Sequence, residues 1–325
     1  MKNIRISILG AGNIAHRMAD TVNAVEGVTL RAVASRDLKK AEAFAEKHGA
    51  EKAFGSYEEL YNDPDTDVVY VATPHSFHFE QAKASLLHGK HAICEKPMTI
   101  NARQAKELFD IAGERGLFVS EAIWTRYIPL AEVLREKLTE GVIGEPRIMT
   151  ANYGFNSDAP RMIEPSLAGG ALLDLGIYPL TVISMVFGEE IEKIQTSGVL
   201  TDKGVDAHSV TLITFKDGKM ATMMTSIDTI MDSKVIIYGS EGRIEMNFVC
   251  NWESIDIYGA DGRLKERIPR EQQLNGFEYE VAAMAEAIRE GKPETEKVPR
   301  ALLVRMMERM DALRSAWGMR YPGED

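Results

Sequence analysis

The first third of the chain alternates short β-rich runs with helical stretches, and this alternation limits the folds that the chain can adopt. Five runs rich in apolar and β-branched residues occur at 4–9, 29–35, 68–72, 91–95 and 117–120. Strands that alternate with helices form a parallel sheet with helices on both faces. The carboxyl ends of such strands meet at one edge of the sheet, where these folds bind ligands.

Capping signals separate the expected strands and mark the ends of the intervening helices. Ser56 and Glu59 have the spacing of a capping box, and Asp37 and Asn101 are expected N-caps. The expected stops are glycines, which tolerate the left-handed conformation of a C-cap: Gly49, Gly89 and Gly116.

The first expected strand runs directly into the segment GAGNIA, which indicates a dinucleotide site. Gly10 and Gly12 permit a tight turn and a close approach of the backbone to a pyrophosphate, with Ala15 in the third small position. The helix that follows offers unpaired N–H groups and the positive end of its dipole. We expect Gly10, Gly12, Asn13 and Ile14 to bind the cofactor. The alternative is a purely structural turn.

The end of the second expected strand indicates which dinucleotide binds. Rossmann domains that bind NAD normally carry Asp or Glu here for the ribose hydroxyls, whereas this chain has Ser35 and Arg36. Arginine can face a 2′-phosphate with its planar fork, and Lys40 follows about one helical turn later. We therefore predict NADP, with NAD less favoured, bound by Ser35, Arg36 and Lys40. The alternative is that Arg36 is an ordinary solvated charge.

The run at 68–72 leads into TPHSFH, which places further polar groups at the same edge. His75 and His78 are three residues apart, but no nearby cysteine or carboxylate completes a metal-ligand set. We predict no metal and expect cofactor contacts from Thr73, Pro74, His75 and His78. A surface role for His78 remains the alternative.

The run at 91–95 ends in Glu95 and Lys96, which a buried strand seldom does for packing reasons, because unpaired charges are costly to bury. At the strand end the pair can line a cleft instead, where Lys96 would stabilise negative charge on a substrate oxygen. Pro97 restrains the backbone beside the lysine and can be cis. Both charged residues are expected at the cofactor, with Lys96 catalytic. The alternative is a strand-end salt bridge.

The stretch from Gly169 to Gly188 reads as a nearly all-apolar helix with one charged side chain, Asp174. Tyr178 lies four residues further on and shares its face. A tyrosine with a pKa of about 10 is a poor base unless a cation lowers that pKa, which Lys96 could do. These three residues form a reasonable acid–base set. The alternative is a buried Asp–Tyr hydrogen bond.

The second part of the chain is rich in β-stretches such as 209–215 and 234–240, with hairpin turns expected at 217–218 and 261–262. Two amphipathic helices are expected at 277–291 and 300–317. The stretch 219–231 is apolar enough to suggest that a partner subunit covers one face of a sheet.

Four motifs occur in an order and spacing that carry a family resemblance: GAGNIA, TPHSFH, EKPMTIN and GGALLDLGIYP. Over essentially its whole length the chain resembles the glucose–fructose oxidoreductase/inositol dehydrogenase (Gfo/Idh/MocA) family. The segments CEKPM, EAIWTRYIP and WGMRYP are most similar to the dimeric dihydrodiol dehydrogenases, also called NADP-dependent D-xylose 1-dehydrogenases.

The resemblance implies a Rossmann domain over residues 1–122. Over 123–325 it implies an α/β domain with a large, mostly antiparallel sheet that binds substrate and forms a homodimer. It also implies a cis peptide before Pro97 and catalytic roles for Lys96, Asp174 and Tyr178. The residues implied to contact substrate are Trp124, Arg126, Phe155, Arg161, Asp174 and Tyr178.

Composition excludes few functions but narrows the setting. The net charge of −11 and the absence of a basic stripe argue against nucleic acid or an anionic membrane as a partner. No apolar run approaches the roughly 18 residues needed to cross a bilayer. Cys94 and Cys250 match no disulfide or metal spacing, so we expect a cytoplasmic protein.

Together these features predict an NADP-dependent oxidoreductase that transfers a hydride between the nicotinamide and a sugar, a dihydrodiol or a similar small polyol. Tyr178 is the expected general base, assisted by Lys96, although Lys96 itself could hold that role. Asp174 is expected to orient the tyrosine or the substrate hydroxyls and to share the proton. A nicotinamide-dependent glycosidase and a non-catalytic dinucleotide sensor remain alternatives. The sequence leaves open the substrate, the physiological direction and the choice between dimer and tetramer.

Overall fold

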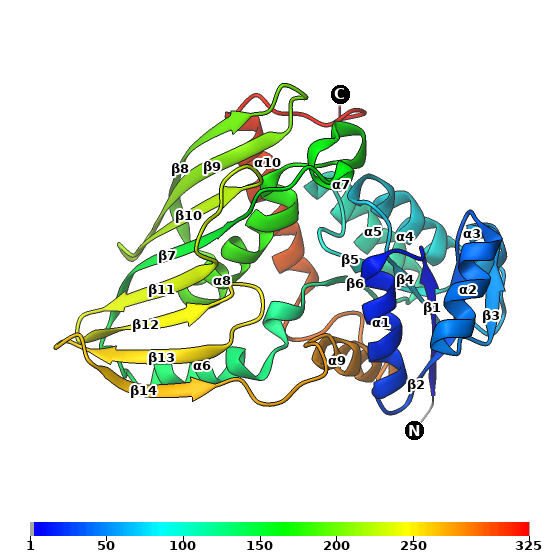
Figure 1. Ribbon diagram of the computed structural model, residues 1–325, viewed down its shortest axis with the longest axis horizontal. Coiled ribbons are helices and arrows are strands. Elements are labelled where there is room, and N and C mark those ends of the chain that lie inside the picture. Colours follow the sequence, from blue (N-terminus) through cyan, green and yellow to red (C-terminus); the bar gives the residue numbers. More distant parts are fainter. Residues whose placement is uncertain (1–2, 325) are drawn as a thin grey trace. The chain divides into compact units, whose positions relative to one another are not determined.

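The computed structural model describes residues 3–324, which form two compact units (Figure 1). The first unit holds the chain up to Ile123 together with Gln273–Glu308, and the second holds Trp124–Gln272 together with the chain from Arg309 on. The chain first passes from the first unit to the second after Ile123, close to the predicted division after residue 122. Residues 273–308, however, pack with the first unit and not with the second. Amphipathic patterning shows that a helix has a buried face and does not show which domain covers it.

The first unit contains a six-stranded parallel sheet with the order β3-β2-β1-β4-β5-β6. This is the doubly wound order, in which the direction of strand addition reverses between β1 and β4. The last strand lies two residues later than predicted, and the three-residue β3 was too short to predict. The bounds are β1 (Ile4–Leu9), β2 (Val28–Ala34), β3 (Lys52–Phe54), β4 (Val68–Val71), β5 (His91–Glu95) and β6 (Val119–Ala122).

The expected N-caps and two of the three expected C-caps of this unit are present, whereas the helix that ends at Leu87 is capped by His88, and Gly89 follows in positive φ. Asp37 Oδ1 accepts hydrogen bonds from the N–H groups of Lys39 and Lys40, and Asn101 Oδ1 accepts one from Gln104. The capping box at Ser56 is present, and Gly49 and Gly116 are left-handed C-caps. The helices are α1 (Asn13–Ala24), α2 (Leu38–His48), α3 (Tyr57–Tyr61), the 3₁₀ turn η1 (His75–Phe77), α4 (His78–Leu87), α5 (Ala102–Arg115), α9 (Glu278–Arg289) and the start of α10 (Arg300–Ala316).

The second unit contains an eight-stranded sheet with the order β14-β13-β12-β11-β7-β10-β9-β8. Only β7 and β10 pair in parallel, which confirms the mostly antiparallel sheet. Both predicted hairpin turns are present, with Gly218 between β9 and β10 and Gly262 between β13 and β14 in positive φ. The strands are β7 (Pro146–Gly154), β8 (Ile191–Leu200), β9 (Asp206–Phe215), β10 (Met220–Ser226), β11 (Lys234–Gly239), β12 (Gly242–Asn247), β13 (Ser254–Gly259) and β14 (Leu264–Pro269).

One face of this sheet packs against the apolar helix expected between Gly169 and Gly188. The helix begins with a π-helical turn, η4 (Leu172–Gly176), and continues as α8 (Ile177–Phe187). Gly176 has no side chain, and a Cβ atom there would lie 3.2 Å from Thr225 Cγ2 on β10, so the glycine allows close packing on the sheet. The shorter helices of the unit are η2 (Trp124–Arg126), α6 (Pro129–Thr139), α7 (Pro160–Ile163) and η3 (Pro165–Leu167).

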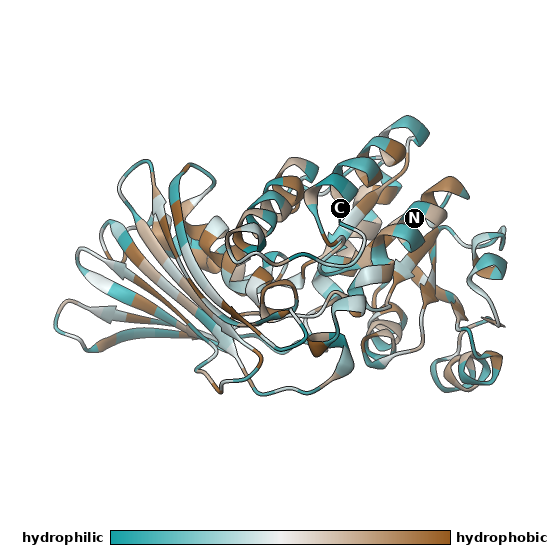
Figure 2. Cartoon of the chain, turned by 90° about the horizontal axis from the view of Figure 1, so that it is seen from above, coloured by the Kyte–Doolittle hydropathy of each residue, from teal (hydrophilic) through white to brown (hydrophobic). Residues whose placement is uncertain are grey.

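The stretch Pro165–Phe187 has the length and composition of a membrane span, and 89 % of its most apolar window is buried inside the protein. It is therefore the core helix of the second unit, which corrects our expectation that no apolar run was long enough. Hydrophobic residues alternate with hydrophilic ones along the strands that it covers (Figure 2), as expected for a sheet with one buried face.

Candidate functional site

The glycine turn after β1 has the geometry of a dinucleotide site. Gly10 has a φ of +102°, and a Cβ atom there would lie 2.8 Å from the carbonyl oxygen of Ala72, so only glycine fits. Nothing lies within 4 Å of the place where Gly12 would carry a Cβ, which leaves room for a ligand to approach the backbone. Gly12 is also the N-cap of α1, and no side chain caps this helix. Its first N–H groups are thus placed to bind a pyrophosphate.

The end of β2 carries the residues predicted to select the cofactor. The Ser35 side chain is buried, and its Oγ accepts a hydrogen bond from the Asp37 N–H at 3.2 Å. Arg36 is exposed and lies beside Tyr57, whose pKa is raised by burial and lowered by the guanidinium. Because Asp37 is occupied as the cap of α2, the exposed charge at this strand end is positive. This arrangement fits a 2′-phosphate better than two ribose hydroxyls.

The end of β4 is tied to the segment after β5 through His78. This side chain is fully buried, with Nδ1 2.7 Å from the carbonyl oxygen of Pro97 and Nε2 2.7 Å from that of Thr73. Burial lowers the pKa of His78, and the two carbonyl groups oppose that shift. The ring of His75 meets the ring of His78 edge-on at 5.6 Å. His78 therefore positions two strand ends, and its direct contact with a cofactor stays a prediction.

Lys96 follows β5 at the same edge, and the expected cis peptide between Lys96 and Pro97 is present. The Glu95 carboxylate accepts hydrogen bonds from the Tyr70 hydroxyl and, at 3.2 Å, from the Lys96 N–H. Glu95 is therefore anchored to its own sheet, so that the residue after it leaves the strand in a defined direction.

Two further buried carboxyl groups near this strand end were missed in the sequence. Glu121, on β6, accepts a hydrogen bond from the Met98 N–H at 2.8 Å. Glu280, on α9, is 1 % exposed, and burial together with the charges of Glu95 and Glu121 raises its pKa well above the usual range. A charge within a buried run was the signal used for Lys96, and it could have identified Glu121. Nothing local relates Glu280 to this strand end.

In the second unit, Asp174 forms an ion pair with Arg161. The carboxylate is buried with a side-chain exposure of 4 %, whereas the Arg161 side chain is 53 % exposed. The buried charge thus has a partner that comes from α7 and also faces solvent. An exposed guanidinium of this kind can exchange part of its hydrogen bonding for a substrate oxygen.

Tyr178 lies one helical turn after Asp174 and belongs to a group of aromatic rings. It contacts Tyr153 edge-on with ring centres 5.9 Å apart, and Tyr153 meets Phe155 in the same way at 5.9 Å. Burial raises the pKa of Tyr153, and the charges of Asp174 and Arg161 also act on it. The structure therefore brings together four of the six predicted substrate contacts, Phe155, Arg161, Asp174 and Tyr178, and adds Tyr153.

The remaining two predicted substrate contacts lie in η2. Trp124 is buried, and Arg126 Nη2 donates a hydrogen bond at 2.7 Å to the hydroxyl of Ser184 on α8. Ser184 in turn donates to the Glu189 carboxylate. Arg126 is thus connected to the middle of α8, and its role toward substrate stays a prediction.

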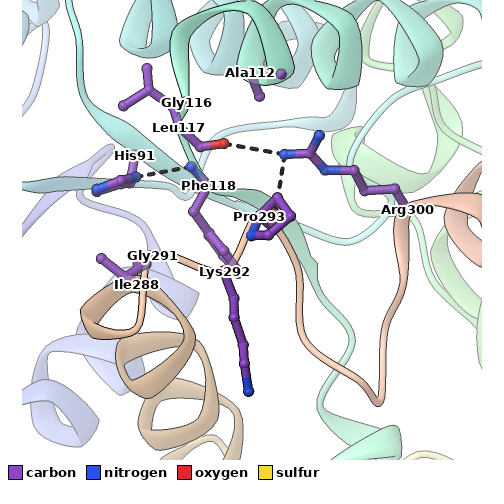
Figure 3. A pocket seen from close by; sticks show the side chains of 11 residues that line it. His91, Ala112, Gly116, Leu117, Phe118, Ile288, Gly291, Lys292, Pro293 and Arg300 are labelled. Atoms are coloured by element: carbon purple, nitrogen blue, oxygen red, sulfur yellow. Dashed lines mark hydrogen bonds between the residues drawn. The ribbon is translucent and has the colours of Figure 1, made fainter.

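Figure 3 shows a cavity of about 100 Å³ in the first unit. Because His91 begins β5 and Lys96 follows its end, the cavity lies at the opposite edge of the sheet from Lys96. It is lined by His91 at the start of β5, and His91 Nδ1 accepts a hydrogen bond from the Phe118 N–H. Arg300 donates to the carbonyl oxygens of Leu117 and Pro293 at 3.2 and 3.1 Å. The cavity is separate from the candidate site because it lies at the other end of β5, and its polar side chains His91 and Arg300 are hydrogen-bonded to the backbone.

Comparison with known proteins assigns the chain to a family. Residues 4–123 match the model of an oxidoreductase family with an NAD-binding Rossmann fold (GFO_IDH_MocA), and residues 132–245 match the C-terminal domain of the same family. The chain is 35 % identical to the trans-1,2-dihydrobenzene-1,2-diol dehydrogenase of Mus musculus over 98 % of both chains.

Two solved structures illustrate the structural likeness. A 3-ketoreductase from Actinomadura kijaniata, in complex with NADP and TDP-benzene, is 28 % identical with a TM-score of 0.87, covering 97 % of this chain and 98 % of that one. An aldose-aldose oxidoreductase from Caulobacter crescentus, complexed with glycerol, is 22 % identical with a TM-score of 0.87 over 97 % of both chains, which shows a shared fold. The chain is therefore a dehydrogenase or reductase that belongs to the Gfo/Idh/MocA oxidoreductase family.

Proposed function

We propose that this enzyme is an NADP-dependent oxidoreductase that acts on a sugar, a dihydrodiol or a similar small polyol. The observation that carries the proposal is the buried Asp174, paired with the half-exposed Arg161 and followed one turn later by Tyr178. Hydrogen-bonding groups beside the rings of Tyr153 and Phe155 suit a compact substrate with hydroxyl groups on an apolar ring or chain. The names of the relatives, a dihydrodiol dehydrogenase and a ketoreductase, support the same substrate class.

The chemistry requires that a substrate C–H bond lose a hydride while its hydroxyl loses a proton. When bound, the nicotinamide supplies the hydride acceptor. We assign the proton to the Tyr178 oxygen. Lys96, at the carboxyl end of β5, supplies a positive charge for an oxygen on which negative charge develops. Asp174 accepts a hydrogen bond from a substrate hydroxyl, and the ion pair with Arg161 orients this carboxylate.

The choice of NADP rests on the exposed positive charge at the end of β2. Arg36 is exposed and Asp37 is occupied as a helix cap, so the ribose side of the site presents a cation. Binding of NADP by the ketoreductase from Actinomadura kijaniata supports the same choice.

A cofactor-reduction assay tests the proposed function. NADP⁺ and NAD⁺ are each combined with D-xylose, D-glucose, myo-inositol and a trans-dihydrodiol, and the absorbance of the reduced nicotinamide is followed. We expect turnover of xylose or of the dihydrodiol with NADP⁺ and much weaker turnover with NAD⁺. Efficient use of NAD⁺ would contradict the role of Arg36. Sugar cleavage without accumulation of reduced cofactor would instead identify a glycosidase.

We also propose that the enzyme forms a homodimer through the face of the eight-stranded sheet that points away from α8. Ile148, Met220 and Tyr238 are direct cross-strand neighbours on β7, β10 and β11 and are 50 %, 37 % and 38 % exposed. A contiguous apolar row of this kind is typical of a protein–protein interface. Light scattering of the wild type should give twice the chain mass, and Ile148→Lys with Met220→Lys should give the monomer. A monomeric wild type would refute the proposal.

A further inference from the structure

The turn that precedes Asp174 is held by a buried carboxyl group with no part in the chemistry proposed above. Asp206 is the first residue of β9, is 0 % exposed, and accepts a hydrogen bond at 2.7 Å from the Leu172 N–H through Oδ2. Its other oxygen, Oδ1, is buried and has no hydrogen-bond partner among the residues that the structure describes. A buried acceptor without a partner is unfavourable, so this position is not explained by hydrogen bonding alone.

Oδ1 of Asp206 packs against Gly170, a position at which only glycine fits. Gly170 has a φ of +122°, and a Cβ atom there would overlap Oδ1 of Asp206. The backbone of the turn therefore passes directly over the Asp206 carboxyl group. The carbonyl oxygen of Gly170 accepts a hydrogen bond from the Asp174 N–H at 3.4 Å. Asp206 and Asp174 thus both contact one residue, Gly170.

The same turn also holds the partner of Asp174. The Gly170 N–H donates at 2.8 Å to the carbonyl oxygen of Met162, which directly follows Arg161. A Cβ atom at Gly169 would lie 2.7 Å from that oxygen, and the Gly169 carbonyl accepts the hydroxyl of Tyr321 at 2.6 Å. The backbone of Gly170 is thus hydrogen-bonded both to Asp174 and to Met162, the residue after Arg161, and Asp206 packs against this same glycine.

We propose that Asp206 is a positioning residue for the reaction: through the turn 169–172 it sets the geometry of the Arg161–Asp174 pair. This inference rests on the proposed function, in which that pair binds a substrate hydroxyl. Misplacement of a binding group by about 1 Å is enough to reduce the rate about 100-fold.

The charge state of Asp206 provides a readout that a purely structural cap lacks. Burial raises the pKa of Asp206 to about 7, against the opposing effects of the Ala171 and Leu172 N–H groups and of Arg314 on α10. Arg314 is the charged side chain that acts on Asp206, and Asp206 in turn raises the pKa of the buried Tyr321 hydroxyl. The ionised form is the stronger acceptor, and it is lost when the pH falls below about 7.

Two substitutions and one control test the proposal in the full-length enzyme. Asp206→Ala removes the acceptor and should lower kcat/KM for the substrate about 10- to 100-fold with unchanged affinity for NADPH. Asp206→Asn keeps an acceptor oxygen, so kcat/KM should stay within about threefold of wild type, and the decline of kcat/KM below about pH 7 should be weaker. The control is Asp256→Asn, a buried carboxylate on β13 bound to Arg267, which should leave kcat/KM and its pH profile unchanged.

A second measurement does not depend on turnover. Hydrogen–deuterium exchange should become faster at residues 169–176 in Asp206→Ala and stay slow in Asp206→Asn and in Asp256→Asn. Unchanged exchange there, or unchanged kcat/KM in Asp206→Ala when the wild type is active, overturns the inference. A wild type without turnover refutes the proposed function instead, while the exchange experiment still decides whether Asp206 holds the turn.

Discussion

Asp63 in the first unit and Asp174 in the second are buried aspartates that each pair with an arginine, and the two pairs differ in the exposure of that arginine. In the first unit, Asp63 accepts hydrogen bonds from Arg31 Nε and Nη2 at 2.9 and 3.1 Å, and both side chains are buried. In the second unit, Asp174 is just as buried, but Arg161 is 53 % exposed. A closed pair can only hold the fold together, whereas an open pair can also bind a ligand.

The surroundings of the two pairs strengthen this contrast. Asp63 also accepts hydrogen bonds from Thr66 and Lys52, and the Arg31 guanidinium lowers the pKa of Asp63. The Asp174 pair instead lies beside the rings of Tyr153 and Tyr178. The same two residue types therefore serve the fold in one unit and, as we propose, the substrate in the other.

The largest expected effect is on the closed pair. Asp63→Ala leaves the Arg31 guanidinium buried without its main partner, and we expect the free energy of unfolding to fall by about 3–5 kcal/mol. Urea unfolding of the full chain measures this loss, while kcat/KM per folded molecule should not change. The half-exposed Asp65, which pairs with Arg31 and Arg5, is the control, and Asp65→Ala should cost less than about 1 kcal/mol. Equal losses of unfolding free energy in Asp63→Ala and Asp65→Ala would contradict the view that the buried pair stabilises the fold more than the half-exposed one.

The open pair should show the reverse behaviour. Asp174→Asn removes the charge that Arg161 balances and that we propose to bind a substrate hydroxyl. We expect kcat/KM to fall about 100- to 1,000-fold, or about 2.7–4.1 kcal/mol in transition-state free energy. The free energy of unfolding should change by less than about 1 kcal/mol, because the Arg161 guanidinium that loses its counter-charge is half-exposed. A variant that unfolds readily but retains its kcat/KM would reverse our assignment of the two pairs.

A third carboxyl group, Asp206, should contribute to the free energy of unfolding with a pH dependence opposite to that of Asp63. The pKa of Asp63 is lowered by Arg31, so its contribution to stability is present above the unfolded pKa of about 4 and is lost as the pH falls further. The pKa of Asp206 is raised to about 7, so the folded state binds its proton more tightly, and this stabilisation declines as the pH rises through about 7.

The difference between wild type and Asp206→Asn isolates the Asp206 contribution. Between pH 5 and pH 7 wild type should lose roughly 2–3 kcal/mol relative to Asp206→Asn, since each pKa unit corresponds to about 1.4 kcal/mol. Urea unfolding at several pH values measures this slope. Parallel stability curves for the two proteins would show that Asp206 does not titrate in this range.

The smallest expected effect concerns the choice of cofactor in the first unit. Arg36→Ala removes the exposed charge at the end of β2, and we expect the ratio of kcat/KM for NADP⁺ to that for NAD⁺ to fall about 10-fold, or about 1.4 kcal/mol. Lys39→Ala, a neighbouring exposed charge on α2, is the matched control and should leave the ratio nearly unchanged. An unaltered ratio in Arg36→Ala would mean that another group selects the dinucleotide.

Much of the candidate site followed from local patterns. The turn at Gly10 and Gly12, the strand end at Lys96 and the lone charge at Asp174 each stand out against the residues around them. By contrast, no pattern singled out Asp206. It lies three residues before the expected strand at 209–215, where an aspartate is typical of a loop, and the structure shows it to be the buried first residue of β9. Arg161 was predicted as a substrate contact, but its pairing with Asp174 was not.

By itself the sequence determined the elements, their caps and the turns, together with the residue types at the carboxyl ends of the strands. These features depend on backbone sterics and on periodicity within a few residues, so they are visible in a linear string. Only the tertiary structure decided that 273–308 packs with the first unit, that Glu280 lies near Glu95, and that Asp206 closes the turn before Asp174. Such contacts join residues tens to hundreds of positions apart, and they form because particular faces meet in the folded chain, which no local pattern specifies.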